Sequence, residues 1–108
     1  MADTHKILGQ QDPVAATLTA LYTVPASTQA VVNVFIANRS AVATSFRVSV
    51  AIAGAADANQ QYLAYDVAIA GTITAKIIGI SLGAADVIRC YATLATLSFV
   101  ATGVELTV

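Results

Sequence analysis

The sequence predicts an all-β domain. The expected fold is a single antiparallel β-sandwich of about seven strands, immunoglobulin-like or jelly-roll-like, with an extended N-terminal arm. Three observations predict it. Apolar residues alternate with small or polar ones, β-branched residues crowd every segment, and turn-forming residues recur at short intervals. No stretch shows a convincing helical period.

The alternation is clearest in residues 44–53, where Phe46, Val48 and Val50 are separated by Arg47 and Ser49. Such a strand turns one face to a core and the other outward. Between the strands lie turn signals such as Pro-Ala-Ser at 25–27 and Asn-Arg-Ser at 38–40. The expected strands cover residues 19–24, 29–38, 44–53, 61–70, 72–82, 86–94 and 96–107.

The N-terminal stretch lacks sustained alternation. Residues 1–17 are therefore predicted to form an arm, and residues 18–108 the β-sandwich domain. Such a terminal segment is mobile unless contacts hold it in place. Ile7 and Leu8 are the candidates for anchoring the arm on a neighbouring subunit.

Charge is scarce in this chain. Charged residues make up 10% and hydrophobic residues 57%, whereas a soluble domain usually carries about 25% charged residues. This composition excludes intrinsic disorder, which combines low hydrophobicity with high charge. Nucleic-acid binding is not expected, because the five basic residues form no obvious patch in the sequence.

Membrane insertion and export are not expected either. A spanning helix needs about 20 consecutive apolar residues, and polar residues interrupt every candidate run. Residues 1–11 are polar and lack the apolar core of a signal peptide. Cys90 is the single cysteine, so no intrachain disulfide can form, which suits assembly in a reducing cytoplasm.

A metal site has little support. The tetrapeptide Gly-Ala-Ala-Asp occurs at residues 54–57 and 83–86, and Asp57, Asn59 and Asp86 could offer oxygen ligands. Calcium requires about six to eight oxygens, usually with several carboxylates close in sequence. A glycine turn closed by an aspartate side chain is the favoured interpretation. We expect no metal and no cofactor.

Catalysis is not expected. The single histidine, His5, lies in the predicted arm, and Cys90 lies within a predicted strand, where a buried packing role is favoured. These two residues are the one combination that could form a nucleophilic pair. No phosphate-binding loop, dinucleotide-binding motif or paired carboxylates are present.

The remaining site candidates are interface residues. Arg47, Asp66 and Arg89 lie within predicted strands, where an intersubunit ion pair could fix register or the side chains could simply be solvated. Tyrosine combines an apolar ring with a polar hydroxyl, which suits a core or interface position more than stacking on a sugar. The tyrosines are Tyr22, Tyr62, Tyr65 and Tyr91.

The scarcity of charge predicts association. A small domain has a large surface for its volume, and here the outward strand positions carry Ala, Thr, Ser and Val in place of Lys and Glu. Large exposed apolar patches mark contact surfaces. The chain is therefore expected to form a homo-oligomer or to cover this surface with another protein.

Seven segments of the chain together form a recognisable pattern of turns and strand cores. They are Lys6-Ile7-Leu8-Gly9-Gln10, residues 21–26, Asn38-Arg39-Ser40, residues 44–48, residues 54–57, Tyr62-Leu63-Ala64-Tyr65-Asp66 and residues 86–92. In these segments the chain resembles small structural proteins of tailed bacteriophages. The likeness extends from about Lys6 to Glu105, with one departure at Thr72-Ile73-Thr74, where an acidic or aromatic residue is expected after Gly71.

The resemblance implies a virion component that is assembled in the host cytoplasm. The favoured role is a capsid cement, or decoration, protein that forms trimers and binds the major capsid protein. The alternative is a tail, baseplate or fibre component that binds other tail proteins and can act as a receptor- or glycan-binding module.

Overall fold

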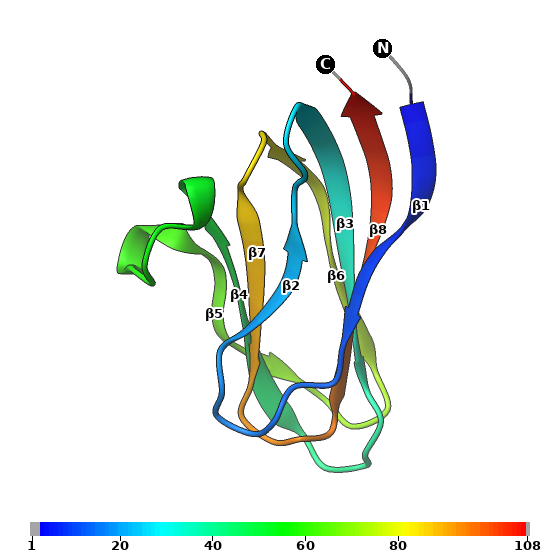
Figure 1. Ribbon diagram of the computed structural model, residues 1–108. Helices are drawn as coiled ribbons and strands as arrows, with labels where there is room; N and C mark the ends of the chain where they lie inside the picture. The colour runs from blue at the N-terminus through cyan, green and yellow to red at the C-terminus, as the bar shows by residue number, and fades with distance from the viewer. Residues whose placement is uncertain (1–2, 108) are drawn as a thin grey trace.

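Two four-stranded antiparallel sheets pack face to face in the computed structural model, which describes residues 3–107 (Figure 1). Sheet A has the order β1-β8-β3-β6 and sheet B the order β2-β7-β4-β5. The protein is thus a β-sandwich, as predicted. The strands are β1 (Asp3–Gln11), β2 (Thr19–Thr23), β3 (Thr28–Asn38), β4 (Thr44–Ala51), β5 (Tyr62–Ile69), β6 (Thr74–Leu82), β7 (Val87–Ala92) and β8 (Leu97–Thr107).

The seven expected strands are all present, and β1 is an additional one. The sequence predicted an extended arm over residues 1–17, anchored on a neighbouring subunit through Ile7 and Leu8, but residues 3–11 pair with β8 of the same chain along the edge of sheet A. The register shifts between Ile7 and Gly9, so Ile7 is exposed while Leu8 packs against the core. This bulge interrupts the two-residue period, which is why the strand is not visible in the sequence. Residues 1, 2 and 108 lie outside the described residues.

Two predicted strand boundaries differ for a local reason. β4 ends at Ala51 because a 3-10 turn, η1 (Ile52–Gly54), follows it, with Ala53 at a left-handed φ of 52°. β6 begins at Thr74 because Thr72 has a φ of 61° in the preceding turn. A second 3-10 turn, η2 (Asn59–Gln61), precedes β5. At Ala53 and Thr72 the left-handed residue turns the backbone away from the neighbouring strand, so the pairing stops there.

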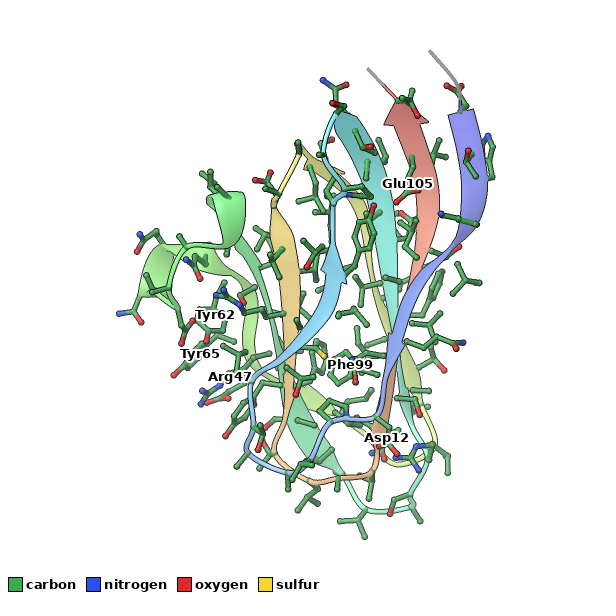
Figure 2. All side chains as sticks on the ribbon, viewed as in Figure 1. Asp12, Arg47, Tyr62, Tyr65, Phe99 and Glu105 are labelled. Carbon is green, nitrogen blue, oxygen red and sulfur yellow. The ribbon has the colours of Figure 1, made fainter. Side chains whose placement is uncertain are left out.

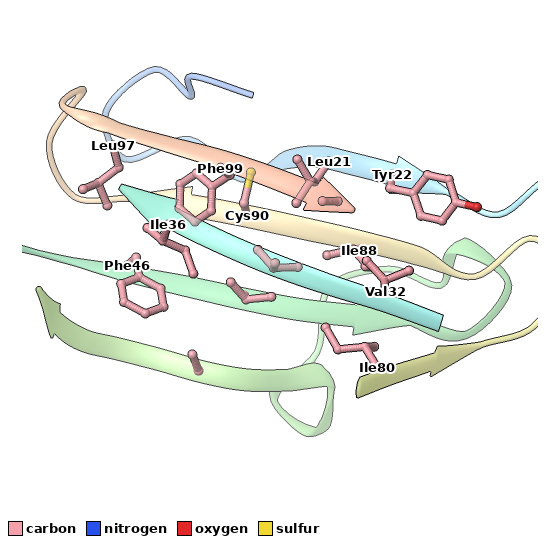
Figure 3. Close-up of a cluster of buried hydrophobic side chains, with 14 of the residues drawn as sticks. Leu21, Tyr22, Val32, Ile36, Phe46, Ile80, Ile88, Cys90, Leu97 and Phe99 are labelled. Atoms are coloured by element: carbon pink, nitrogen blue, oxygen red, sulfur yellow. The ribbon is translucent and has the colours of Figure 1, made fainter. Parts of the chain in front are cut away.

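The core lies between the sheets and is built from aliphatic residues around two phenylalanines (Figure 3). Phe46 of β4 and Phe99 of β8 meet edge to face, with ring centroids 6.4 Å apart, a preferred aromatic arrangement. Cys90 of β7 is fully buried beside them, and burial raises the pKa of its thiol to about 12. Cys90 therefore serves as a packing residue. His5, the other half of the predicted nucleophilic pair, lies on β1 with its side chain exposed.

Candidate functional site

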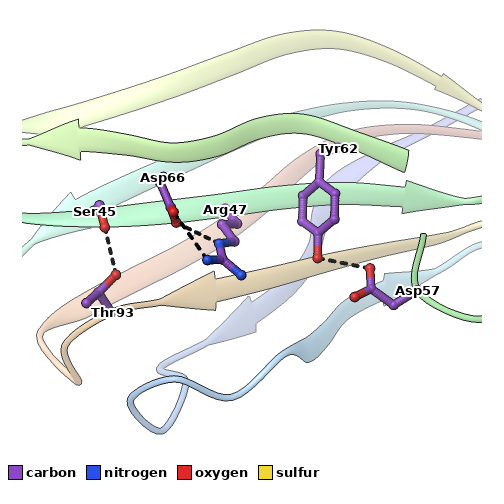
Figure 4. A network of polar contacts seen from close by, with 6 residues as sticks. All are labelled: Ser45, Arg47, Asp57, Tyr62, Asp66 and Thr93. Carbon is purple, nitrogen blue, oxygen red and sulfur yellow. Dashed lines mark hydrogen bonds and ion pairs between the residues drawn. The ribbon is translucent and has the colours of Figure 1, made fainter. Parts of the chain in front are cut away.

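The outer side of sheet B carries a cluster of charged and aromatic side chains, which we call the Arg47 cluster (Figure 4). Arg47 Nε donates to Asp66 Oδ1 over 2.6 Å, and its Nη2 donates to Asp66 Oδ2 over 3.2 Å. The guanidinium carbon lies 4.1 Å from the ring centroid of Tyr65 and 4.4 Å from that of Tyr91. Arg47 is thus held by a bidentate carboxylate and two cation–π contacts.

A β-bulge in the edge strand β5 creates this arrangement. Val67 pairs with Phe46 and Ala64 pairs with Val48, so Tyr65 and Asp66 both lie opposite Arg47. Asp66 has a left-handed φ of 51°. Bulges re-aim side chains, and aspartate tolerates this conformation better than most residues. The bulge therefore brings an aromatic ring and a carboxylate to the same arginine.

Tyr62 extends the cluster toward the η2 turn. Its ring meets Tyr65 edge to face at 5.0 Å, and its hydroxyl donates to Asp57 Oδ1 over 2.9 Å. Burial, together with this hydrogen bond, raises the pKa of Tyr62. Tyr65 remains 56% exposed and lines a shallow open depression with Tyr62 and Asn59. Figure 2 shows Arg47, Tyr62 and Tyr65 gathered at this side of the molecule.

The opposite charges of Arg47 and Asp66 are paired within one chain. The hydrogen bonds from Arg47 hold the pKa of Asp66 below its ordinary value, and the same contacts raise the pKa of Arg47. The sequence left open an intersubunit ion pair for these residues, whereas the structure pairs Arg47 with Asp66 inside one chain. Arg89 Nη2 donates to the Gly54 carbonyl of η1 over 3.3 Å, so it also has a partner within the chain.

The two Gly-Ala-Ala-Asp segments serve different contacts. Asp86 accepts hydrogen bonds from the backbone N–H of Gly83 and of Ala53, each over 2.9 Å, which closes the second segment as the favoured interpretation predicted. Asp57 instead accepts from Tyr62. Among residues 3–107, no three His, Cys, Asp or Glu side chains come together as a metal-binding group.

A second polar site was missed by the sequence analysis. Tyr22 on β2 donates its hydroxyl to Glu105 Oε2 over 2.6 Å, and Lys6 Nζ on β1 lies 2.9 Å from Glu105 Oε1. The Glu105 side chain is only 14% exposed, and these two partners hold its pKa below the ordinary value. The sequence does indicate that Glu105 faces inward. Leu97, Phe99 and Ala101 occupy alternate buried positions of β8, and Glu105 continues that series.

The Glu105 contacts predict acid sensitivity. Its folded pKa is lowered from 4.5, so the stabilisation is fully present above that pH and is lost as the pH falls through the folded value. Glu105→Gln is expected to lower the unfolding free energy at pH 7 by about 1–2 kcal/mol. It should also flatten the decline below pH 4.5, as measured by urea unfolding at a series of pH values. Asp66 has a lowered pKa too, so Asp66→Asn measures the part of the acid decline that comes from the Arg47 ion pair. An unchanged acid limb in Glu105→Gln would contradict the assignment.

The outer side of sheet A has a different character. We call its exposed and half-exposed hydrophobic residues the apolar face. Val31 and Phe35 of β3 are 41% and 37% exposed and lie in register with Val104 and Val100 of β8. The members of the apolar face are Ile7, Val31, Phe35, Ile78, Val100, Val104 and Leu106. Ile7, a predicted interface residue, lies on this surface in strand β1, with its side chain 55% exposed.

The sequence matches no protein-family model, and no curated protein matches it either. Within residues 3–107, no helix has the length and apolarity needed to cross a membrane.

Proposed function

We propose that the protein is a structural component of a tailed-bacteriophage particle that self-associates, with a trimer favoured, and reinforces the particle through contacts with its other proteins. The favoured role is capsid decoration, with the major capsid protein as the partner. The phage assignment rests on the segments that resemble that family. The structural observation that carries the contact role is the apolar face on sheet A.

Contact, rather than chemistry, is what these surfaces offer. The strongest polar groups already have partners, in the ion pairs Lys6–Glu105, Arg39–Asp12 and Arg47–Asp66. The apolar face, in contrast, consists of hydrophobic side chains that gain stability when water leaves them, at about 25 cal/mol per Å². A protein of this kind stabilises an assembly by adding buried area between subunits.

The test compares particles with and without this protein. Purified protein is added to capsids that lack it, and binding is measured by co-sedimentation and electron microscopy. We expect density at regular positions on the capsid surface and a higher temperature of genome release. Capsids that bind none of the protein and release their genomes at an unchanged temperature would contradict the decoration role.

The alternative is a tail, baseplate or fibre component with a glycan-binding surface. The observation in its favour is the depression beside the exposed ring of Tyr65, where Asn59 adds an amide. A sugar ring could stack on the tyrosine while the amide binds its hydroxyls. A glycan array tests this, with Tyr65→Ala expected to abolish binding and Leu63→Ala, at an exposed position of the same strand, expected to keep it. An array without any bound glycan would exclude this alternative.

A further inference from the structure

We infer that the apolar face of sheet A is the surface through which copies of this chain bind one another. This inference rests only on the self-association included in the proposed function and specifies where that contact lies. Two copies that turn the same face toward each other form a closed two-fold pair, whereas the favoured trimer would need a contact between two different surfaces. The occupant is a second copy of the same chain, which turns its own apolar face toward the first. The outer side of sheet B, with the Arg47 cluster, then stays accessible to solvent or to a different protein.

The charge distribution favours a copy as the occupant. The hydrophobic pairs Val31–Val104 and Phe35–Val100 occupy the two inner strands of sheet A, and no ionised side chain lies among them. The ionisable side chains on this side lie on the two edge strands: Lys76 of β6 in register with Phe35, and Asp3 and His5 of β1 in register with Leu106 and Val104. A strongly acidic or basic partner would therefore find no opposite charges at the centre of this face. A second copy brings an equally uncharged centre, and specific interfaces match potentials in this way.

Polar groups on the face have partners within the chain. Between the two hydrophobic pairs lie Asn33 and Thr102, which are in register with each other. Asn33 Oδ1 accepts a hydrogen bond from the N–H of Gly79 over 2.9 Å, and Thr102 Oγ1 donates to the carbonyl of Lys6 over 3.3 Å. Removing water from a polar group is costly when the group is left unpaired. These contacts lower that cost for Asn33 Oδ1 and Thr102 Oγ1 at the centre of the face.

The size of sheet A is near that of a stable interface. β1 and β6 have 9 residues each and β3 and β8 have 11. At about 3.3 Å per residue and about 4.8 Å between strands, the whole sheet measures roughly 30 by 20 Å, or about 600 Å² in projection. Upright side chains make its accessible area larger. A standard interface buries about 800 Å² per partner. A face-to-face contact of two copies that used the whole sheet would therefore approach the area of a standard interface.

Sheet B offers no comparable surface. Its outer side carries Arg47, Asp66 and Arg89, and the ring faces of Tyr65 and Tyr91 are in contact with the arginine. Burying this side against a copy would place like charges near one another and remove water from an ion pair, which is costly. The two sides of the sandwich thus differ in their fitness for self-association.

The test places one charge on the apolar face and measures mass in solution by light scattering and sedimentation. Phe35→Glu is the main variant, because Lys76 in the neighbouring strand can accommodate the new carboxylate in the single chain. Val31→Glu is the second variant. Leu63→Glu in strand β5 of sheet B is the control, since Leu63 is 49% exposed and lies outside the apolar face. Circular dichroism verifies that each variant is folded.

We expect the wild type and Leu63→Glu to be oligomers, and Phe35→Glu and Val31→Glu to dissociate with a dissociation constant raised at least about tenfold. If Phe35→Glu and Val31→Glu are both folded and keep the wild-type mass, the inference is overturned. Self-association through another surface would then still stand. A wild type that is monomeric at every concentration would overturn it as well, and the particle-binding test then decides the proposed function independently.

A measurement on the wild type alone covers the case in which the variants fail to fold. Hydroxyl-radical footprinting at rising protein concentration reports on two exposed aromatic residues, Phe35 in sheet A and Tyr65 in sheet B. Phe35 is expected to become protected as the chains associate, while Tyr65 keeps its reactivity. Protection of Tyr65 with unchanged Phe35 would overturn the inference.

Discussion

Phe99→Ala is expected to lower the unfolding free energy by about 3–5 kcal/mol. Phe99 is fully buried at the centre of the core, where it contacts Phe46 edge to face (Figure 3). Truncation removes buried hydrophobic surface and the aromatic pair, and it leaves a cavity between two sheets that cannot collapse freely. Because a domain of this size is stable by only about 5–15 kcal/mol, the variant should be close to unfolding at physiological temperature.

Urea unfolding followed by circular dichroism measures this loss. Phe99→Leu is the matched control, because it keeps most of the volume and should cost about 1 kcal/mol. If Phe99→Ala unfolded within 1 kcal/mol of the wild type, the two sheets would not be packed around this ring.

Gly103→Ala is expected to lower the unfolding free energy of the protein by about 3 kcal/mol. Gly103 lies in β8 between β1 and β3, and an added Cβ would overlap the carbonyl oxygen of Val31 in the backbone of β3. It would also lie 3.1 Å from the Cα of Val32. Backbone atoms cannot rotate away as a side chain does, so the two strands must separate locally.

Gly79→Ala is the control for Gly103→Ala. Gly79 has a left-handed φ of 76°, but an added Cβ would meet no atom within 4 Å. Its expected cost is about 1 kcal/mol, which comes from backbone conformation alone. Thermal unfolding and hydrogen exchange of β8 compare the two variants. Equal losses would show that the space beside Gly103 is larger than the structure indicates.

Much of the fold could be predicted from the sequence because the seven predicted strands carry alternation over part of their length or are bounded by clear turn signals. In β3, buried Val32, Val34 and Ile36 follow one another at every second position. β1 could not be predicted in the same way, because its bulge at Leu8 changes which side chains face inward. Long-range pairing with β8, the last strand in the chain, is what makes that segment part of the sheet.

The candidate site was predictable only in its composition. Arg47, Asp66 and the tyrosines were identified as interface candidates from their strand positions, and the scarcity of charge predicted apolar outer surfaces. The pairing of Arg47 with Asp66 depends on a bulge that arises from the register of β4 and β5. The apolar face forms because particular strands lie side by side in sheet A. The alternation within one strand shows which residues point outward, but it does not show which strands are neighbours.

The antiparallel pairing of β1 with β8 places Asp3 beside Leu106 at one end of the sandwich (Figure 1). Paired strands lie only about 5 Å apart, so a linker of a few residues could join the two ends of the described chain. New termini opened in the exposed loop at residues 41–43 would then emerge at the opposite pole. The topology thus lends itself to circular permutation, which would let a fused peptide project from either pole without disturbing the sheets.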